Sequence, residues 1–176
     1  MTASSERGGR PTQAEFHAAI ARRADRWFSA CLRITRNRQL AEDAVQEALL
    51  SAWHKRDQFQ GTASLETWIH RIAVNAALQL MRKERPDRLL PLGPELVDDG
   101  ESPEQGVLDR DVDAVLAAAL RCLSDLERVC FVLKHLEQWR LKEIAAELHT
   151  DVGTVKQAIF RAVRKLRPRV PEMLSA

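Results

Sequence analysis

The sequence predicts an all-α protein of two small helical domains joined by a flexible acidic linker. Apolar residues recur every three or four positions on both sides of the middle of the chain, which is the helical period. No segment shows the alternation of apolar and polar residues that is typical of a strand. Four of the seven prolines and three of the seven glycines lie in residues 86–113, a stretch that therefore cannot sustain a long helix.

These helix breakers divide the chain. We expect a disordered N-terminus over residues 1–12, a first domain over 13–85, the linker over 86–113 and a second domain over 114–170. A linker of this length is long for a loop inside one compact domain. Each flanking segment is near the lower size limit for burying a stable core, so both domains should be simple helical units.

The first domain is predicted to hold three helices. Apolar stripes at helical spacing run through residues 16–32, 40–53 and 65–80. Gly61 helps to break the chain before the third helix, and Ser64 can cap the first turn of that helix. The sequence therefore predicts two long helices, a loop and a third helix.

Charge is distributed unevenly along the chain. The 27 Lys and Arg residues exceed the 25 Asp and Glu residues by only two. Residues 1–85 nevertheless carry a net charge of +5, residues 86–113 carry −7 and residues 114–176 carry +4. Such asymmetry indicates partners better than the total does. The low net charge is therefore no argument against binding of nucleic acid.

Membrane and secreted proteins are disfavoured. The longest apolar run, Ala114 to Leu120, has seven residues, whereas a membrane span needs about 20. The N-terminus has no apolar signal segment. The three cysteines are odd in number and lack CxxC spacing, which disfavours a disulfide framework. We expect a cytoplasmic protein without membrane insertion.

An enzyme is also disfavoured. The five histidines are scattered, and the sequence has no HExxH motif and no Gly-rich phosphate loop. We expect no catalytic residue, no cofactor and no metal site. A zinc or thiol site built from Cys122, Cys130 and His135 remains an alternative, although free cysteines are often simply buried.

The second domain is predicted to contain a helix-turn-helix. Helices over residues 115–123 and 127–135 precede a short helix over 142–148, a three-residue turn and a helix over 153–166. Asp151 can cap the last helix by accepting the Thr154 amide. The His at position 149 in the turn weakens this interpretation slightly, because a positive φ costs a non-glycine residue about 1 kcal/mol.

The last helix is predicted to have an apolar inner face and a basic outer face. Val152, Val155 and Ile159 should pack inward. In a major groove, Gln pairs with adenine, Lys or Arg pairs with guanine, and further cations suit phosphates. The alternative is an ordinary helical hairpin with a solvated basic face. The residues left for the outer face are Lys156, Gln157, Phe160, Arg161, Arg164 and Lys165.

Two independent motif blocks resemble bacterial RNA polymerase sigma factors. AEDAVQEALLSAW and FQGTASLETWIHRIAVNAA, within residues 37–85, are similar to conserved region 2. Residues 123–166 are similar to region 4. The two regions occur in the family's order, with a short linker and without a region-1 extension or a region 3. This architecture resembles the extracytoplasmic-function (group 4) sigma factors of the sigma-70 superfamily.

The resemblance implies an alternative-sigma transcription initiation factor. Such a protein binds core RNA polymerase, directs it to promoters by recognising −35 and −10 elements, and assists promoter melting. The implied partners are the β′ clamp helices and β flap of core polymerase, promoter DNA and an anti-sigma factor. The alternative is a sigma-like mimic that sequesters an anti-sigma factor without initiating transcription.

The resemblance also implies three sets of binding residues. The polymerase contacts would be Asp43, Gln46, Glu47 and Leu50. The −10 contacts would be Phe59, Gln60, Gly61, Thr62, Ser64, Arg71, Asn75, Arg82 and Lys83. The −35 contacts would be Thr154, Lys156, Gln157, Phe160, Arg161 and Arg164.

Each of the four tryptophans could lie in the core or at the surface. Trp68 could serve as a platform for a base, but it shares an apolar stripe with Ile72, so we assign it to the core. The same argument assigns Trp27 and Trp53 to the core. Trp139, beside the helix-turn-helix, is left open.

Overall fold

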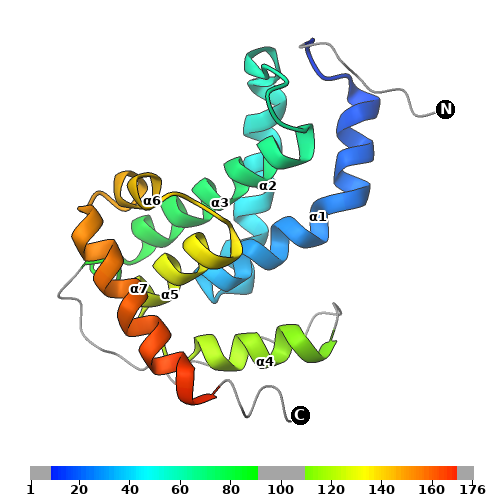
Figure 1. Cartoon of the computed structure of the whole chain (residues 1–176). Helices are drawn as coiled ribbons and strands as arrows, with labels where there is room; N and C mark the ends of the chain where they lie inside the picture. The colour runs from blue at the N-terminus through cyan, green and yellow to red at the C-terminus, as the bar shows by residue number, and fades with distance from the viewer. Residues whose placement is uncertain (1–8, 91–109, 170–176) are drawn as a thin grey trace. The chain divides into compact units, whose positions relative to one another are not determined.

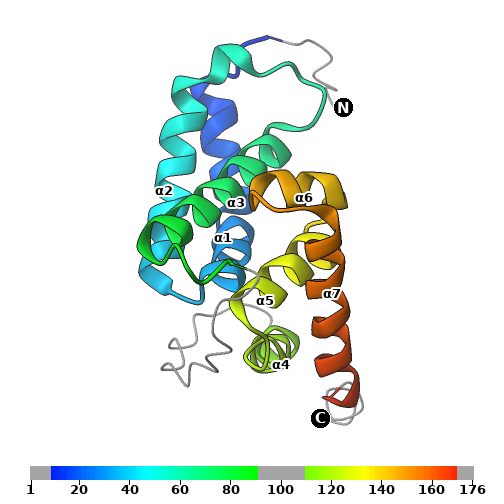
Figure 2. The ribbon, with the colours of Figure 1, turned by 90° about the vertical axis from the view of Figure 1, so that its left-hand side faces the viewer.

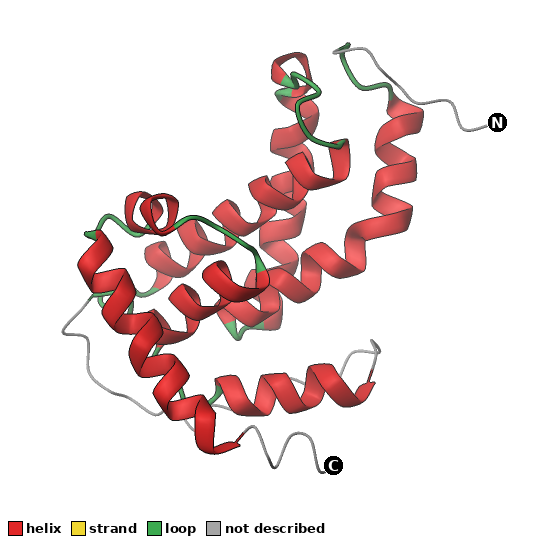
Figure 3. Cartoon of the chain, viewed as in Figure 1, coloured by secondary structure: helices red, strands yellow, loops and turns green. Residues whose placement is uncertain are grey.

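The computed structural model describes residues 9–90 and 110–169, and every regular element in these two ranges is a helix (Figure 3). The all-α prediction is therefore confirmed. The chain divides into two compact units between Leu80 and Met81. Most of the predicted linker, residues 86–113, lies outside the described residues, as do residues 1–8 of the predicted disordered N-terminus. None of the helices in the two described ranges is long and apolar enough to cross a membrane.

The first unit contains three α-helices, and all three predicted helices are present (Figure 1). The first two helices extend a few residues beyond their apolar stripes at both ends, and the third extends beyond its stripe only at its C-terminal end. The elements are α1 (Gln13–Thr35), α2 (Arg38–His54), the short helix η1 (Arg56–Gln58) and α3 (Leu65–Glu84).

A row of alanines brings α1 and α2 together. The alanine row consists of Ala41, Ala44, Ala48 and Ala52, which lie on one side of α2 and are completely buried. Methyl side chains allow two helix backbones to approach closely. Because α1 covers this side of α2, the opposite side of α2 is left for polar and exposed residues.

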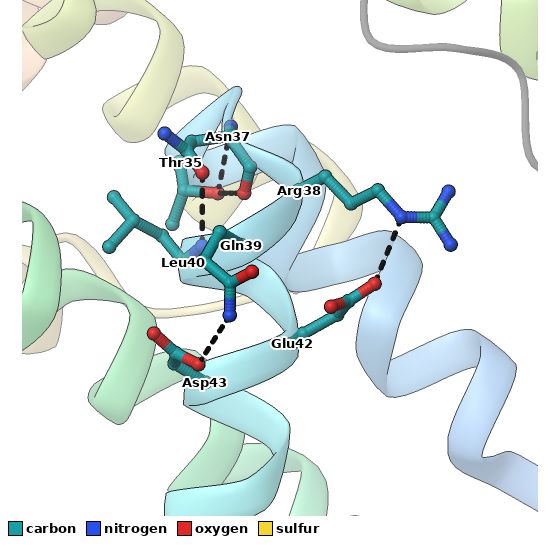
Figure 4. Close-up of polar contacts among 7 residues, drawn as sticks. All are labelled: Thr35, Asn37, Arg38, Gln39, Leu40, Glu42 and Asp43. Atoms are coloured by element: carbon teal, nitrogen blue, oxygen red, sulfur yellow. Dashed lines mark hydrogen bonds and ion pairs between the residues drawn. The ribbon is translucent and has the colours of Figure 1, made fainter.

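Polar contacts set the turn between α1 and α2 (Figure 4). Arg36 ends α1 in the left-handed conformation, with φ of 53°. The Asn37 side chain accepts a hydrogen bond from the Leu40 amide at 3.0 Å and so begins α2. The buried Thr35 hydroxyl lies 2.9 Å from the Cys31 carbonyl oxygen, to which it donates. These bonds fix where α2 starts and therefore which residues it exposes.

A hydrogen-bonded cap begins α3, as predicted. Two further contacts join α3 to α1. The Ser64 hydroxyl accepts a hydrogen bond from the Thr67 amide at 3.1 Å. An ion pair joins Arg22 to Glu66 at 2.5 Å, and this arginine lowers the pKa of the Glu66 carboxyl. Deeper in the unit, the Cys31 thiol donates to the Ala73 carbonyl oxygen at 3.5 Å.

The second unit holds the predicted helix-turn-helix. Figure 2 shows α6 crossing the beginning of α7, and the two helices are in contact. The elements are α4 (Arg110–Leu120), α5 (Asp125–Phe131), the π-helical turn η2 (Val132–Leu136), α6 (Leu141–Glu147), α7 (Val152–Leu166) and η3 (Arg167–Arg169).

The helices before the helix-turn-helix differ from the prediction in two ways. The predicted helix over 115–123 begins and ends earlier, as α4. The predicted helix over 127–135 changes from α to π geometry at Val132, where the Glu137 amide donates to the Val132 carbonyl oxygen at 3.0 Å. Because a π turn needs only one extra residue per turn, the apolar period of the sequence does not reveal it.

Two of the tryptophan assignments are wrong. Trp27 is buried, as predicted, and so is Trp139. Trp53 and Trp68 are only half-buried. Trp53 lies one residue before the end of α2, and Trp68 lies in the first turn of α3. Near a helix end a neighbouring helix covers only part of a large ring, so the apolar stripe overstates the burial of both residues.

The Asp151 carboxylate caps α7. The two oxygens of Asp151 accept hydrogen bonds from the Thr154 amide at 2.9 Å and the Thr154 hydroxyl at 2.8 Å. The cap predicted from sequence is therefore present. A Cβ atom on Gly153 would lie 2.8 Å from Asp151 Oδ1, so a larger residue there would displace the cap. His149 has the positive φ expected of the turn, 52°.

We expect Asp151→Asn to remove a pH-dependent contribution to the free energy of unfolding. The Thr154 bonds lower the pKa of Asp151 below its ordinary value in the folded protein. A carboxyl with a lowered pKa stabilises the folded state above its unfolded pKa of about 3.9, and this contribution disappears as the pH falls through the folded pKa. Thermal unfolding should show wild type more stable than Asp151→Asn at pH 7, with a difference that shrinks below about pH 4. A difference independent of pH would contradict this role.

Candidate nucleic-acid interface

The recognition helix α7 rests on α5 and α6 through one apolar row. The inner row consists of the buried residues Val155, Ala158, Ala162 and Leu166. Val155 is therefore placed as predicted, but Val152 and Ile159 are only half-buried. The two alanines take their place because they continue the row at three- and four-residue spacing, which lets α7 approach its neighbours closely.

The opposite side of α7 faces solvent and carries most of the predicted −35 contacts. The exposed apolar ring of Phe160 stands among cationic and amide side chains, and 67% of this residue is accessible. Amides and guanidinium groups suit base edges and phosphates, whereas an apolar ring suits the methyl group of thymine. The outer face of α7 is defined by the exposed residues Lys156, Gln157, Phe160, Arg161 and Arg164.

Two predicted residues lie apart from this surface. Thr154, a predicted −35 contact, is half-buried, and its hydroxyl takes part in the Asp151 cap. Lys165, which was predicted for the outer face, is half-buried and forms an ion pair with Glu127 of α5 at 2.8 Å. The helical period alone does not reveal this partner, because the two residues are far apart in sequence.

The predicted polymerase contacts share one side of α2. Asp43, Gln46, Glu47 and Leu50, which we call the polymerase face, lie opposite the alanine row. Gln46 and Glu47 are exposed, and Leu50 is 64% accessible. Asp43 is half-buried and accepts a hydrogen bond from Gln39 Nε2 at 2.9 Å (Figure 4). This side of α2 thus combines an exposed leucine with two carboxylates.

The predicted −10 loop presents polar residues next to an aromatic pair. Gln60, Gly61, Thr62 and Ser64 are exposed. Gly61 has a positive φ of 70°, which turns the chain at this point. Phe59 is half-buried, and its ring centroid lies 5.3 Å from that of Trp68 at an interplanar angle of 53°.

Trp68 is a candidate binding residue that the sequence prediction assigned to the core. Its ring packs against Phe59 on one side and remains partly accessible. An aromatic ring that is held in place by a neighbouring ring and is still accessible offers a surface on which an unpaired base can stack. The signal for this arrangement in the sequence is the position of Trp68 in the first turn of α3, four residues after the Ser64 cap.

The predicted −10 contacts on α3 follow the loop along one side of the helix. Arg71, Asn75 and Arg82 are half-buried and recur at multiples of the helical turn, while Lys83 is exposed at the end of the helix. Asn75 Oδ1 is buried and has no hydrogen-bond partner among the described residues. A buried amide oxygen without a partner is uncommon in folded proteins, which makes Asn75 a residue to test.

The thiols do not form a metal-binding group. No cluster of three or more His, Cys, Asp or Glu side chains within the described ranges could hold a metal ion. Burial raises the pKa of the Cys130 thiol to about 12, which keeps it protonated and therefore a poor metal ligand. The Cys122 thiol donates a hydrogen bond to the Ala119 carbonyl oxygen at 3.0 Å.

Both units match models of known protein families. Residues 19–86 match sigma-70 region 2, and residues 113–166 match sigma-70 region 4. The first match contains α2 with its polymerase face and the −10 loop, and the second contains the helix-turn-helix.

Similar proteins agree with these matches. The extracytoplasmic-function (ECF) RNA polymerase sigma factor SigW of Bacillus subtilis is 31% identical over 159 residues, and the alignment covers 85% of each chain. The sigma factor RpoE of Bartonella quintana, solved in complex with the anti-sigma factor NepR, has a TM-score of 0.53 at 24% identity, with 92% of this chain and 98% of that chain covered. CnrH, solved with the cytosolic domain of CnrY, has a TM-score of 0.53 at 25% identity, with coverage of 92% and 90%. The chain therefore belongs to the ECF sigma factors of the sigma-70 family.

Proposed function

We propose that this ECF sigma factor binds core RNA polymerase through the polymerase face of α2, reads a −35 element with α7, and holds a −10 element with the loop before α3 and with α3 itself. In this proposal residues 13–85 form region 2 and the acidic linker follows from residue 86. Region 4, predicted over residues 114–170, already begins with α4 at Arg110. Like other sigma factors, the chain is a transcription factor and not an enzyme.

The observation that carries this proposal is the division of α7 into two sides. The inner row of α7 packs against α5 and α6. The five residues of the outer face point away from these helices and are therefore available to DNA. Three of these residues are cationic, one is an amide and one is aromatic. This set can contact phosphates, adenine or guanine edges and a thymine methyl group from one helix in a major groove.

Region 2 is suited to a single strand rather than to a duplex. The Phe59–Trp68 pair gives a platform for stacking, and Asn75 Oδ1 gives a buried acceptor for the edge of a flipped base. Holding a base outside the stack lowers the free energy of the opened DNA relative to the duplex. Arg71, Arg82 and Lys83 would follow the strand's phosphates.

We further propose that an anti-sigma factor holds the protein inactive in the cytoplasm. The support is that the sigma factor RpoE, whose fold is similar to that of this chain, was solved in complex with the anti-sigma factor NepR. CnrH, which is also similar to this chain, was solved with the cytosolic domain of CnrY. The exposed Leu50 on α2 and Phe160 on α7 are surfaces that DNA or polymerase would cover in the active complex. A partner that covers either residue first would compete directly.

Transcription by the reconstituted holoenzyme tests the function. The chain is combined with core polymerase and genomic DNA, and the 5′ ends of the transcripts are sequenced. We expect start sites that share one upstream motif with two separated elements. Failure to initiate at any promoter, together with tight binding of an anti-sigma factor, would instead support a sigma-like mimic.

We expect Gln46→Ala combined with Glu47→Ala to weaken binding to core polymerase by about tenfold or more, because truncating central interface residues removes a large part of the binding energy. Titration of labelled chain with core polymerase measures this affinity. The matched control is Glu84→Ala, which removes an exposed carboxylate at the end of α3 and should leave the affinity unchanged. Equal affinity of the double variant and wild type would show that this face is only solvated.

We expect Asn75→Ala to impair promoter opening without affecting assembly with core polymerase. Loss of one base contact should reduce discrimination between −10 variants by about tenfold. Permanganate reactivity of unpaired thymines measures opening, and abortive transcription from a panel of −10 variants measures discrimination. A profile over the panel identical to that of wild type would remove Asn75 from the base-binding site.

A further inference from the structure

We propose that Lys165 is a positioning residue for −35 recognition: its pairing with the buried Glu127 fixes the rotation of α7 about its axis, and it does not itself contact phosphate. This inference rests on the proposed reading of DNA by α7. It concerns a cation that was predicted for the outer face of α7 but was not included among the implied −35 contacts.

The carboxylate of Glu127 is held from two helices at once. Its side chain is only 5% accessible, and Oε2 lies 2.8 Å from Lys165 Nζ. The same Oε2 accepts a hydrogen bond from the Ser124 amide at 3.0 Å. In return the Glu127 amide donates to the Ser124 hydroxyl at 3.3 Å. Glu127 is thus fixed to the start of α5 by a capping box, and Lys165 joins the last turn of α7 to that fixed point.

Burial of the Glu127 carboxylate favours its ion pair with Lys165. A buried carboxylate without a nearby cation is highly unfavourable. Movement of the Lys165 ammonium to a DNA phosphate would leave the Glu127 carboxylate in that state. The other buried charge of this region, Arg128, forms its own ion pair with Asp125 at 2.6 Å. Arg164, next to Lys165 in sequence, is exposed and bears the same charge, so it provides a natural comparison.

The packing of α7 explains why a rotational restraint is needed. The middle of its inner row consists of Ala158 and Ala162, whose methyl groups interlock little with a neighbouring helix. The two alanines therefore restrict rotation of α7 about its axis less than longer side chains at these positions would. Lys165 lies to one side of this row, and an ion pair off the contact line resists a roll of the helix about its axis.

A roll of α7 would affect specific binding more than general binding. Gln157 and Arg161 can distinguish bases only if their hydrogen-bonding groups meet the base edges in a defined geometry. Contacts between cations and phosphates tolerate displacement because they depend mainly on charge. Loss of the Lys165–Glu127 pair should therefore lower the preference for the −35 sequence while preserving the salt dependence of binding.

The test compares single and double variants of the full chain. The probes are a duplex selected by the wild-type chain from a random-sequence pool and a shuffled duplex of the same composition. Affinity for each is measured over a range of salt concentrations for Lys165→Met, Glu127→Gln, the double variant and Arg164→Gln. Circular dichroism confirms that each variant is helical.

We expect Lys165→Met to reduce the ratio of specific to nonspecific affinity by about tenfold, with an unchanged slope of log affinity against log salt. Arg164→Gln should lower that slope by about one for both duplexes, as loss of a phosphate contact does. If Lys165→Met fails to fold, the double variant, in which both charges are neutral, carries the same expectation.

Two results would overturn the proposal. A fall of about one in the slope for Lys165→Met, with equal loss of affinity for both duplexes, would make Lys165 a phosphate contact. An unchanged ratio together with an unchanged slope would make the pair irrelevant to recognition. Failure of the wild-type chain to select any motif would overturn the proposed −35 function itself, which is a distinct outcome.

Discussion

Burial of the inner row of α7 is the constraint on which the DNA-binding unit depends. Val155, Ala158, Ala162 and Leu166 must be covered, and α5 and α6 cover them. Once this side of the helix is fixed, the helical period determines which residues face away from the protein. The outer face of α7 therefore needs no contacts of its own to be presented to DNA. The Asp151 cap fixes the residue at which the helix begins, and hence the register of that face.

The first unit uses the same principle on α2. The alanine row is turned toward α1, and the polymerase face lies on the opposite side of the helix. The polar turn at Asn37 determines where α2 begins and so which side chains reach solvent. In both units, residues that stabilise the fold and residues that we propose to bind partners occupy opposite sides of one helix. The binding surface can then be rich in polar groups without disturbing the packing of the core.

The sequence predicted the features that depend on local order. Helical period and capping residues identified all three helices of the first unit, the helix-turn-helix and the caps at Ser64 and Asp151. Features that depend on distant residues were not predicted. The partner of Lys165 lies on another helix, and the exposure of Trp53 and Trp68 depends on how far a neighbouring helix extends. The roles of individual binding residues came from the resemblance to a family, because a helical stripe shows which residues are exposed but not what they bind.

The separation of the two sides of α7 has a consequence for how such proteins diversify. The exposed residues of its outer face lie outside the buried core of the described residues, so exchanges at these positions change the free energy of folding little. If α7 reads the promoter as proposed, promoter preference can change after gene duplication without loss of a stable protein, while the proposed polymerase face of α2 stays the same. A cell can thus accumulate many such regulators, each with its own set of genes, from one inherited scaffold.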